Sequence, residues 1–502
     1  SEPTTLLGEA RAVLRDRFLK ADVGITGANF LVAETGTSVI VTNEGNGDLT
    51  QILPKVHIVI ASIEKITPTL NDVAEILRLL ARSATGQDMS CYTTFSTGPR
   101  RPGDPDGPEE YHVVILDNGR SEMLGSEFRE ALRCIRCGAC ANVCPPYREV
   151  GGHVFGHIYS GAIGLVVTPF LHGIEAAAGP QSLCLSCNAC ETVCPADIPL
   201  PRQILDVRKM VVAKKGLPVA KRVVLNVYAS PRAFDLATRI GSRVQRPLQR
   251  GRFVRGRHLP ILKQQTRWRS MPALARRPLR DRLPQGDVEV ARAAVIPNGA
   301  VGKTVALFPG CMTDRLFPEQ GEAIAETLRA LGARIVAPAG LHCCGLPANN
   351  SGDDRHARAM ARHTIQTLEK TLDRIDVDYI VSGSASCVAT LTQDYGHLFR
   401  NEPAWKKRAG ALAARVMDFT SFLDRIAQLP AGSLTNGERL TVTYHDSCQG
   451  MNALGLRQEP RRLLRDVLGC ELRELEENTV CCGFGGSFSF DYPAISERLM
   501  NR

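Results

Sequence analysis

The chain has 502 residues, a net charge of +9, 44% hydrophobic residues and 23% charged residues. This length predicts about three or four domains instead of a single core, and the composition is that of an ordinary globular protein. The best apolar stretch, residues 158–171, is too short to span a bilayer and is interrupted by Gly161, Gly164 and Pro169.

Most of the 17 cysteines lie in tight clusters with Cys-x-x-Cys spacing. In so long a chain this pattern predicts metal binding and not a disulfide framework. We therefore expect a cytoplasmic protein, with attachment to the inner face of the membrane as the alternative location. The chain begins without Met and stops inside an expected helix, so we expect both ends to be incomplete.

Residues 1–120 alternate short apolar runs with helical spacing, which predicts an α/β domain. We expect turns at Thr35-Gly36 and at residues 43–47, where Glu34, Asn43 and Glu44 are ordinary turn residues. The expected strands are residues 29–34, 38–42, 56–60 and 111–116, and we expect the last two to be buried. The expected helix is residues 70–82.

Residues 121–215 carry eight cysteines in two identical runs, each ending in Cys-Pro. This spacing is that of the two-cluster ferredoxins, in which the fourth Cys of each run binds the other [4Fe–4S] cluster. The alternative is a pair of structural zinc sites, which two identical four-Cys runs fit poorly. The expected ligand sets are Cys134, Cys137, Cys140 and Cys194 for one cluster, and Cys184, Cys187, Cys190 and Cys144 for the other.

Residues 216–300 are rich in arginine and read as a basic connector with short helices. Such a run could contact nucleic acid or an anionic membrane. No nucleic-acid motif accompanies it, so we expect a linker or a surface for an acidic partner, and no nucleic-acid partner.

Residues 301–502 contain an internal repeat, because the spacing from Cys311 to Cys448 matches that from Cys343 to Cys481 almost to the residue. Each copy reads as strand, lone Cys, helix, strand and Cys-Cys-Gly, which predicts a duplicated α/β domain. Recurrence at strand ends favours a metal or redox role over buried free thiols. The candidate metal ligands are Cys311, Cys343, Cys344 and Cys387 in the first copy, and Cys448, Cys481 and Cys482 in the second.

Weaker candidates accompany these motifs. Gly483-x-Gly485-Gly486 lacks the third glycine of a dinucleotide loop and does not predict a nucleotide site. Cys91 and Cys470 stand alone and read as structural thiols. His342, His445 and Asp446 adjoin the Cys motifs and read as hydrogen-bonded loop residues, although a proton-transfer role is open. The catalytic residues are not identified by any of these patterns.

Several short stretches accompany the Cys134 run in the N-terminal part: GITGANF at 24–30, AETG at 33–36, NEGN at 43–46, LPKVH at 53–57, RSATGQ at 82–87, DGPEE at 106–110 and LDNGR at 116–120. With these stretches, residues 1–215 resemble the iron–sulfur protein of the bacterial L-lactate utilisation system. With the duplicated Cys motifs, residues 301–502 resemble its companion with two cysteine-rich CCG domains, and also glycolate oxidase and heterodisulfide reductase subunits. The family's CCG pattern ends in Cys-x-x-Cys, whereas here Ser384 takes the place of the first of that pair.

The resemblance implies an α/β multidomain protein that fuses two subunits. Its expected parts are a LUD-type α/β domain (1–120, N-terminally incomplete), a helical two-[4Fe–4S] ferredoxin-type module (121–215), the basic connector (216–300), a first CCG domain (301–430) and a second, C-terminally incomplete CCG domain (431–502).

The implied function is that of an iron–sulfur electron-transfer subunit in an NAD-independent L-lactate dehydrogenase complex, which oxidises lactate to pyruvate. The implied cofactors are two [4Fe–4S] clusters and one further cluster in the CCG domains. The implied partners are a second LUD protein, lactate or a similar 2-hydroxy acid, and an electron acceptor such as a quinone. The alternatives are an adaptor for another 2-hydroxy acid or glycerol-3-phosphate dehydrogenase, or a heterodisulfide-reductase-like subunit. Electrons would enter at the CCG half, or lactate would bind the LUD domain near Glu34 and Glu44.

Overall fold

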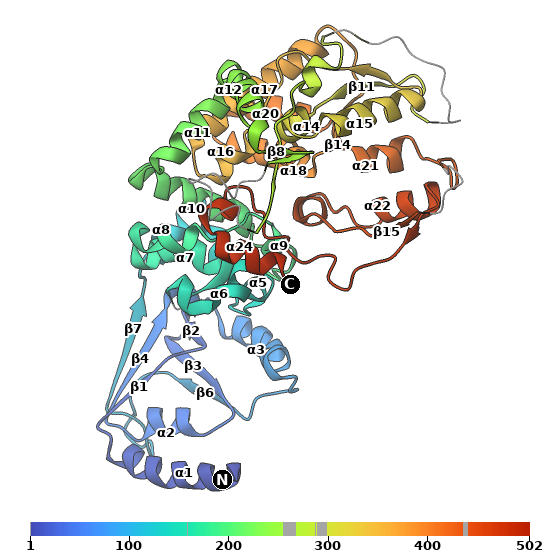
Figure 1. The fold of residues 1–502 in the computed structure, drawn as a ribbon. Helices are drawn as coiled ribbons and strands as arrows, with labels where there is room; N and C mark the ends of the chain where they lie inside the picture. The colour runs from blue at the N-terminus through green and yellow to red at the C-terminus, as the bar shows by residue number, and fades with distance from the viewer. Residues whose placement is uncertain (1, 158, 255–267, 287, 289–298, 435–439) are drawn as a thin grey trace. The chain divides into compact units, whose positions relative to one another are not determined.

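The computed structural model describes residues 2–157, 159–254, 268–286, 288, 299–434 and 440–502. The chain divides into two compact units, residues 1–132 and residues 133–502 (Figure 1). Among the described residues, no helix combines the length and the apolar character needed to cross a membrane. Both units mix helices with parallel strands, so the α/β multidomain prediction is confirmed.

The first unit contains two sheets, one parallel and one mixed. The parallel sheet has the order β1-β4-β7, and the mixed sheet has the order β5-β2-β3-β6. Val32, Val39 and Val73 form the buried centre of the mixed sheet and its covering helix. The elements are α1 (Pro3–Lys20), β1 (Val23–Thr26), β2 (Phe30–Val32), β3 (Thr37–Thr42), α2 (Asn46–Ile52), β4 (Val56–Ser62), η1 (Ile63–Lys65), β5 (Ile66–Thr67), α3 (Leu70–Thr85), β6 (Tyr92–Ser96), β7 (Glu110–Leu116), α4 (Arg120–Leu124) and η2 (Arg129–Arg133).

The predicted strands and helix of this unit are present, with two corrections. The turn predicted at residues 43–47 is shorter, because α2 already begins at Asn46. The strand predicted as buried at residues 111–116 is exposed along most of its length. It is the edge strand β7, and an apolar run in the sequence does not distinguish an edge strand from a central one.

The first part of the second unit is helical and carries the two four-Cys runs. Its core lies where α7 and α8 pack against α10, with Leu165, Val166 and Ile204 fully buried. Pro145 is the first residue of α6, where its missing N–H costs nothing. The elements are α5 (Ala139–Asn142), α6 (Pro145–Phe155), α7 (Gly161–His172), α8 (Ile174–Gln181), α9 (Ala189–Thr192) and α10 (Leu200–Lys215).

The basic stretch contributes to the core, which its composition did not indicate. It contains α11 (Val219–Ala229), α12 (Pro231–Val244), η3 (Arg246–Leu248), η6 (Leu279–Asp281) and a small antiparallel sheet of β8 (Gln249–Arg250), β9 (Phe253–Val254) and β10 (Met271–Pro272). Leu225 and Leu279 are buried in the two hydrophobic clusters of the first CCG copy. Ion pairs internal to the unit engage three of its arginines, Arg239, Arg280 and Arg282. Arg255, Arg257 and Arg267 lie outside the described residues.

The first CCG copy is built on a fully parallel sheet of order β12-β11-β13-β14, flanked by helices (Figure 1). The chain moves from β11 outward to β12 and then returns to the other side of β11, so the order reverses between β11 and β13. Its elements are β11 (Thr304–Leu307), α14 (Gly310–Arg315), α15 (Pro318–Ala330), β12 (Arg334–Val336), α16 (Leu346–Asn350), α17 (Asp354–Leu372), β13 (Tyr379–Ser382), α18 (Ala385–Ala389), the π-helical turn η7 (Thr390–Asp394), α19 (Tyr395–Leu398), α20 (Pro403–Ala413), β14 (Val416–Asp418), α21 (Phe419–Ser421) and the π-helical turn η8 (Phe422–Ile426).

The second CCG copy repeats the first strand pair. Thr304 pairs with Arg334 in the first copy, and Thr441 pairs with Glu471 in the second. Both partners are displaced along the chain by the same offset that separates Cys448 from Cys311, as the lone cysteines predict. The elements are β15 (Thr441–Val442), the π-helical turn η9 (Gln449–Ala453), α22 (Glu459–Arg462), the π-helical turn η10 (Leu463–Val467), β16 (Glu471–Leu472), α23 (Phe488–Asp491) and α24 (Pro493–Met500).

Candidate metal centres

The two four-Cys runs adopt the same loop conformation. In the first run Arg136 and Gly138 have φ of 62° and 79°, and in the second Ser186 and Asn188 have φ of 55° and 63°. Left-handed residues at alternate positions direct neighbouring N–H groups toward the inside of a loop. The N–H of the residue two after the first Cys donates to its Sγ at 3.4 Å in both runs.

The thiols of the two runs meet across the module. Cys140 is close enough to Cys194 for their charges to interact. Cys144 lies near Cys184, and Cys190 lies near both of them. Burial, followed by the thiols of Cys184, Cys140 and Cys481, raises the pKa of Cys144 to about 12. A thiol in such surroundings becomes a thiolate when a cation binds it. The crossed ligand assignment itself stays a prediction.

The two loops differ in exposure. Ile135, in the first loop, is 66% exposed, whereas Leu185, at the equivalent place in the second, is 8% exposed. Cys137 is exposed, and Cys187 packs beside a hydrophobic cluster that contains Leu185. The second loop is therefore the covered one.

The elements that cover the second loop belong to the second CCG copy. Phe488 and Leu499 complete the cluster around Leu185, and Cys481 packs against it. The helix α24 lies beside α6 (Figure 1), where Arg502 is paired with Glu149 at 2.5 Å.

The thiols of the second CCG copy form one group. Cys481 is near both Cys482 and Cys448, and burial raises its pKa to about 11. The N–H of Gly483, at φ of 72°, donates to Cys481 Sγ at 3.4 Å. This is the same two-residue N–H to sulfur bond that both ferredoxin-type loops make.

This thiol group adjoins the covered ferredoxin-type loop. Cys448 lies near Cys187, and Cys481 lies near Cys144. The turn η9, which follows Cys448, binds the same loop through two amides. Gln449 Nε2 donates to the carbonyl of Ser186 at 2.6 Å, and Asn452 Nδ2 donates to that of Cys187 at 2.9 Å.

The thiols of the first CCG copy lie at the carboxyl ends of three parallel strands. Cys311 follows β11, Cys343 and Cys344 follow β12, and Cys387 follows β13. Open α/β sheets bind ligands at this edge, where the strand order reverses. The placement agrees with the strand-end positions that the repeat predicts.

These four cysteines follow one another at this edge. Cys343 lies near Cys311 and Cys344, and Cys344 lies near Cys387. Cys343, Cys344 and Cys387 are buried, and the contact with Cys311 and then burial raise the pKa of Cys343 well above its ordinary value. Ser384 stands beside Cys387, so a hydroxyl occupies the position where the Cys-x-x-Cys pattern would place a further thiol.

Two of the weaker candidates, His445 and Asp446, have polar partners, whereas both ring nitrogens of His342 are buried without a hydrogen-bond partner among the described residues, against the prediction. His445 Nε2 contacts the carbonyl of Val480 at 2.8 Å, and Arg461 is paired with buried Asp446 at 2.7 Å. His342 packs edge-on against His363, and burial lowers the pKa of His342 to about 4.

The residues suggested for lactate in the first unit also have local roles. Glu34 Oε1 accepts a hydrogen bond from the N–H of Leu70 at 2.7 Å, and so caps α3. The carbonyl of Glu44 accepts from Thr42 Oγ1 at 2.9 Å. The first bond caps a helix 36 residues away, and the second lies within the turn.

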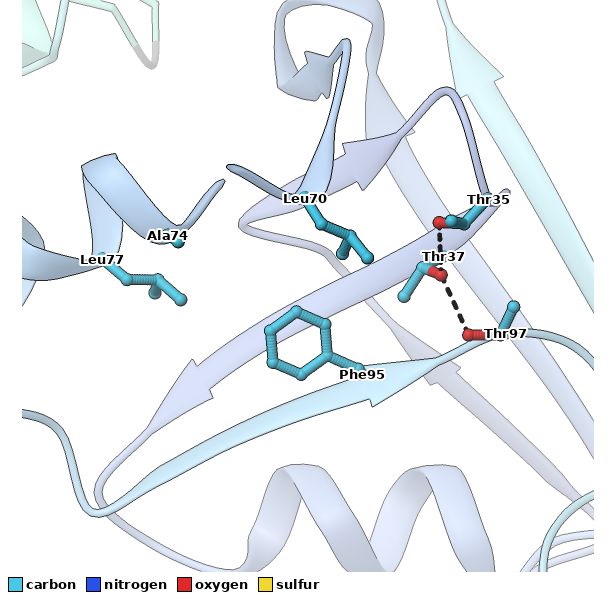
Figure 2. Close-up of a pocket in the computed structure, with 7 residues that line it drawn as sticks. All are labelled: Thr35, Thr37, Leu70, Ala74, Leu77, Phe95 and Thr97. Carbon is cyan, nitrogen blue, oxygen red and sulfur yellow. Dashed lines mark hydrogen bonds between the residues drawn. The ribbon is translucent and has the colours of Figure 1, made fainter. Parts of the chain in front are cut away.

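Thr35, the residue after Glu34, lines a pocket of the first unit. Three threonine hydroxyls line one side of this pocket (Figure 2). Thr37 Oγ1 bonds to Thr35 Oγ1 at 2.7 Å and to Thr97 Oγ1 at 2.9 Å, so these hydroxyls satisfy one another. The remaining lining is apolar: Leu70, Ala74, Leu77 and Phe95. No charged residue is among the seven that line this pocket, which makes it a poor match for the carboxylate of lactate.

Sequence reasoning missed the polar residues that hold the covered loop. Arg208, in α10, donates to the carbonyls of Gln181 and Cys184 at 2.7 and 3.0 Å, and also to that of Asn350 in the first CCG copy. Of these polar residues, only Gln449 could have been suspected from the sequence, because it directly follows Cys448 in a Cys motif. Long-range contacts of this kind have no local pattern.

The arrangement fits iron–sulfur clusters. All the donors are thiols, which suit iron, and N–H groups directed at the sulfurs are the hydrogen bonds that tune such clusters. Within the described part of the chain, no three His, Cys, Asp or Glu side chains converge as around a single ion. The four thiolates of a [4Fe–4S] cluster spread around it, because each binds a different iron.

Three family models match the chain. The LUD domain matches residues 3–116, the 4Fe-4S dicluster domain matches residues 130–198, and the cysteine-rich CCG domain matches residues 305–392 and 442–502. The presence of these three domain types, predicted from the sequence, is thereby confirmed.

Curated relatives match a little under half of the chain. Lactate utilization protein B of Anoxybacillus flavithermus is 46% identical over 244 residues, which are 48% of this chain and 52% of the relative. The protein of the same name from Bacillus subtilis is 46% identical over 228 residues, or 45% of this chain and 48% of the relative. An uncharacterized electron transport protein of Escherichia coli, YkgF, is 52% identical over 207 residues, or 41% of this chain and 43% of the relative.

The chain thus spans about half the length of the curated relatives it matches. A crystal structure of a duf162 family protein from Deinococcus radiodurans matches 20% of this chain and 56% of that chain, with 23% identity. Its TM-score of 0.16 is too low to support any statement about the fold.

Proposed function

We propose that this chain is the iron–sulfur electron-transfer component of a complex that oxidises lactate to pyruvate without a nicotinamide cofactor. The proposal rests on the similarity to proteins named for lactate utilisation, together with the 4Fe-4S dicluster and CCG domains. The observation that carries the electron-transfer part is that the second CCG copy packs on the covered ferredoxin-type loop. Cys481 and Cys187 pack against one hydrophobic cluster, and the amides of Gln449 and Asn452 bind the loop.

In this proposal two [4Fe–4S] clusters are held by crossed ligand sets. Cys134, Cys137, Cys140 and Cys194 hold one, and Cys184, Cys187, Cys190 and Cys144 hold the other. A cluster of this type supplies reversible one-electron storage when bound. The left-handed loops direct N–H groups toward the thiolates, and the packing of Leu185, Phe488 and Leu499 excludes water from one loop.

The CCG thiols would form a further redox centre, with Cys448, Cys481 and Cys482 nearest to the ferredoxin-type module. Because these residues adjoin Cys187 and Cys144, an electron leaving the CCG half has a short path into the covered loop. The exposed loop with Cys137 would then face the acceptor. We expect a second LUD protein to supply the remaining parts of the complex.

The test is reduction by substrate. The complex, purified without oxygen, should lose its iron–sulfur absorbance when lactate is added, and iron analysis with EPR should report two interacting [4Fe–4S] centres. Glycolate and glycerol-3-phosphate serve as comparison substrates, because an adaptor for another dehydrogenase would respond to one of them and not to lactate. Zinc in place of iron after anaerobic reconstitution would contradict the whole proposal.

A further inference from the structure

One arginine links three carbonyls that belong to different parts of the second unit. Arg208 lies in the middle of α10, with its side chain partly buried. Its guanidinium donates to the carbonyls of Gln181 and Cys184 and to Gln181 Oε1, at 2.7, 3.0 and 3.0 Å. It also donates to the carbonyl of Asn350, in the helix that follows Cys343-Cys344-Gly345. A planar fork with several donors is suited to such a junction.

Two amides of the turn η9 also bind this loop. Gln449 and Asn452 donate to the carbonyls of Ser186 and Cys187. Together with Arg208, they bond three of the four carbonyls between Cys184 and Cys187. All three donors direct positive charge, full or partial, at the backbone of a loop that carries two candidate ligands.

The physical consequence follows from electrostatics. Reducing an iron–sulfur cluster adds a negative charge, and its potential depends on nearby charge and on hydrogen bonds around it. A guanidinium in a partly buried position interacts more strongly than one in water. Bonding the carbonyls also holds the loop backbone in place, and with it the N–H of Ser186 that donates to Cys184 Sγ.

We propose that Arg208, Gln449 and Asn452 are positioning residues that fix the Cys184–Cys187 loop and raise the reduction potential of the cluster bound there. The inference rests on the iron–sulfur part of the proposed function and not on lactate as substrate. None of the three touches iron or substrate; each acts through the carbonyl it binds.

The test is an anaerobic redox titration of the full chain, with dithionite as reductant and EPR as the readout. Arg208→Gln, Gln449→Met and Asn452→Leu should each move one of the two cluster signals to a more negative potential and leave the other in place. Arg208→Lys keeps the charge without the fork, so its potential should fall between those of the wild type and Arg208→Gln.

The matched control is Lys214→Gln, which removes a charge from the exposed end of the same helix, where Lys214 is paired with Glu175. It should move neither signal. If Arg208→Gln does not fold, the two amide variants, which each remove one hydrogen bond, carry the test. Full iron content with both signals at wild-type potentials in the variants would overturn the inference alone. A chain that binds no iron would overturn the proposed function as well.

Discussion

At the scale of single residues, the proposed crossed assignment of the fourth cysteines has a direct consequence. Replacing Cys194 by Ala should damage the cluster held by Cys134, Cys137 and Cys140, because Cys194 lies beside Cys140. The cluster completed by Cys144 should survive. Iron analysis should show a loss of about half or less of the iron, and EPR should keep one signal without the interaction between two centres.

The matching variant Cys144→Ala should spare the opposite cluster. If Cys194→Ala instead removes the signal that depends on Cys184, Cys187 and Cys190, each run binds its own cluster and the crossed assignment is wrong.

A second prediction at this scale concerns Gly352, which has φ of +78°. A Cβ placed there would lie 2.8 Å from the backbone carbonyl oxygen of Arg208, so neither the conformation nor the space admits a side chain. Gly352→Ala should therefore destabilise the second unit by about 1–3 kcal/mol, seen as a lower thermal midpoint.

Gly410 provides a control, because Gly→Ala substitution there should change the stability in the opposite direction. It lies inside α20, and a Cβ there would meet no atom within 4 Å. Gly410→Ala should raise the stability by about 1 kcal/mol, because alanine is the better helix former. Equal effects of the two substitutions would contradict the close approach of Gly352 to Arg208.

At the scale of elements, the sequence predicted the features that have a regular spacing along the chain. The four-Cys runs and the two CCG copies were found from spacing alone, and the offset between the copies recurs in the strand register. The helix at residues 70–82 was predicted from its apolar spacing, and α3 has a capping box between Thr69 and Asp72 that fixes its start.

The sequence did not predict contacts between distant elements. The arginine-rich stretch read as a connector, although Leu225 and Leu279 are buried in the first CCG copy. Nor did any pattern reveal that β7 is an edge strand. Burial depends on which elements meet, and a basic or apolar composition does not carry that information.

The π-helical turn η7 supports a prediction on pH. It ends at Asp394, whose pKa is raised to about 6, chiefly by burial. The native state therefore holds a proton more tightly than the unfolded state, whose value is near 3.8. This group favours folding below about pH 4, and that contribution is lost as the pH rises through 6, by at most about 3 kcal/mol.

Asp394→Asn removes the titration, because the amide is neutral at every pH. The variant should be more stable than the wild type at pH 8, and the difference should shrink at pH 5.5. Thermal midpoints at the two pH values measure this. Asp376→Asn, at an exposed position, should show no such trend. A variant that is equally destabilised at both pH values would mean that the Asp394 carboxylate is satisfied in its charged form.

At the scale of the whole molecule, the CCG half is the proposed entry point for electrons. Replacing Cys481 and Cys482 by Ser should abolish the reduction of the ferredoxin-type clusters by lactate, whereas dithionite should still reduce them. Replacing Cys343 and Cys344 by Ser tests the first copy in the same way. Stopped-flow absorbance of the anaerobic complex measures both.

The two double variants also distinguish electron entry at the CCG half from entry at the LUD domain. If lactate reduces the ferredoxin-type clusters at the normal rate in both, the CCG half only relays or stands aside, and entry by way of the LUD domain gains support. Iron content is measured in parallel, so that loss of a cluster is not mistaken for loss of electron entry.

The hydrogen bonds from Gln449 and Asn452 to the loop at Cys184–Cys187 also join groups that are synthesised far apart in time. These amides lie 263 and 265 residues after the carbonyls they bind. A ribosome that has just completed the second four-Cys run has not yet made the groups that fix its shape. The covered loop can therefore make these two hydrogen bonds only after η9 has emerged, so its final form depends on residues near the end of the sequence.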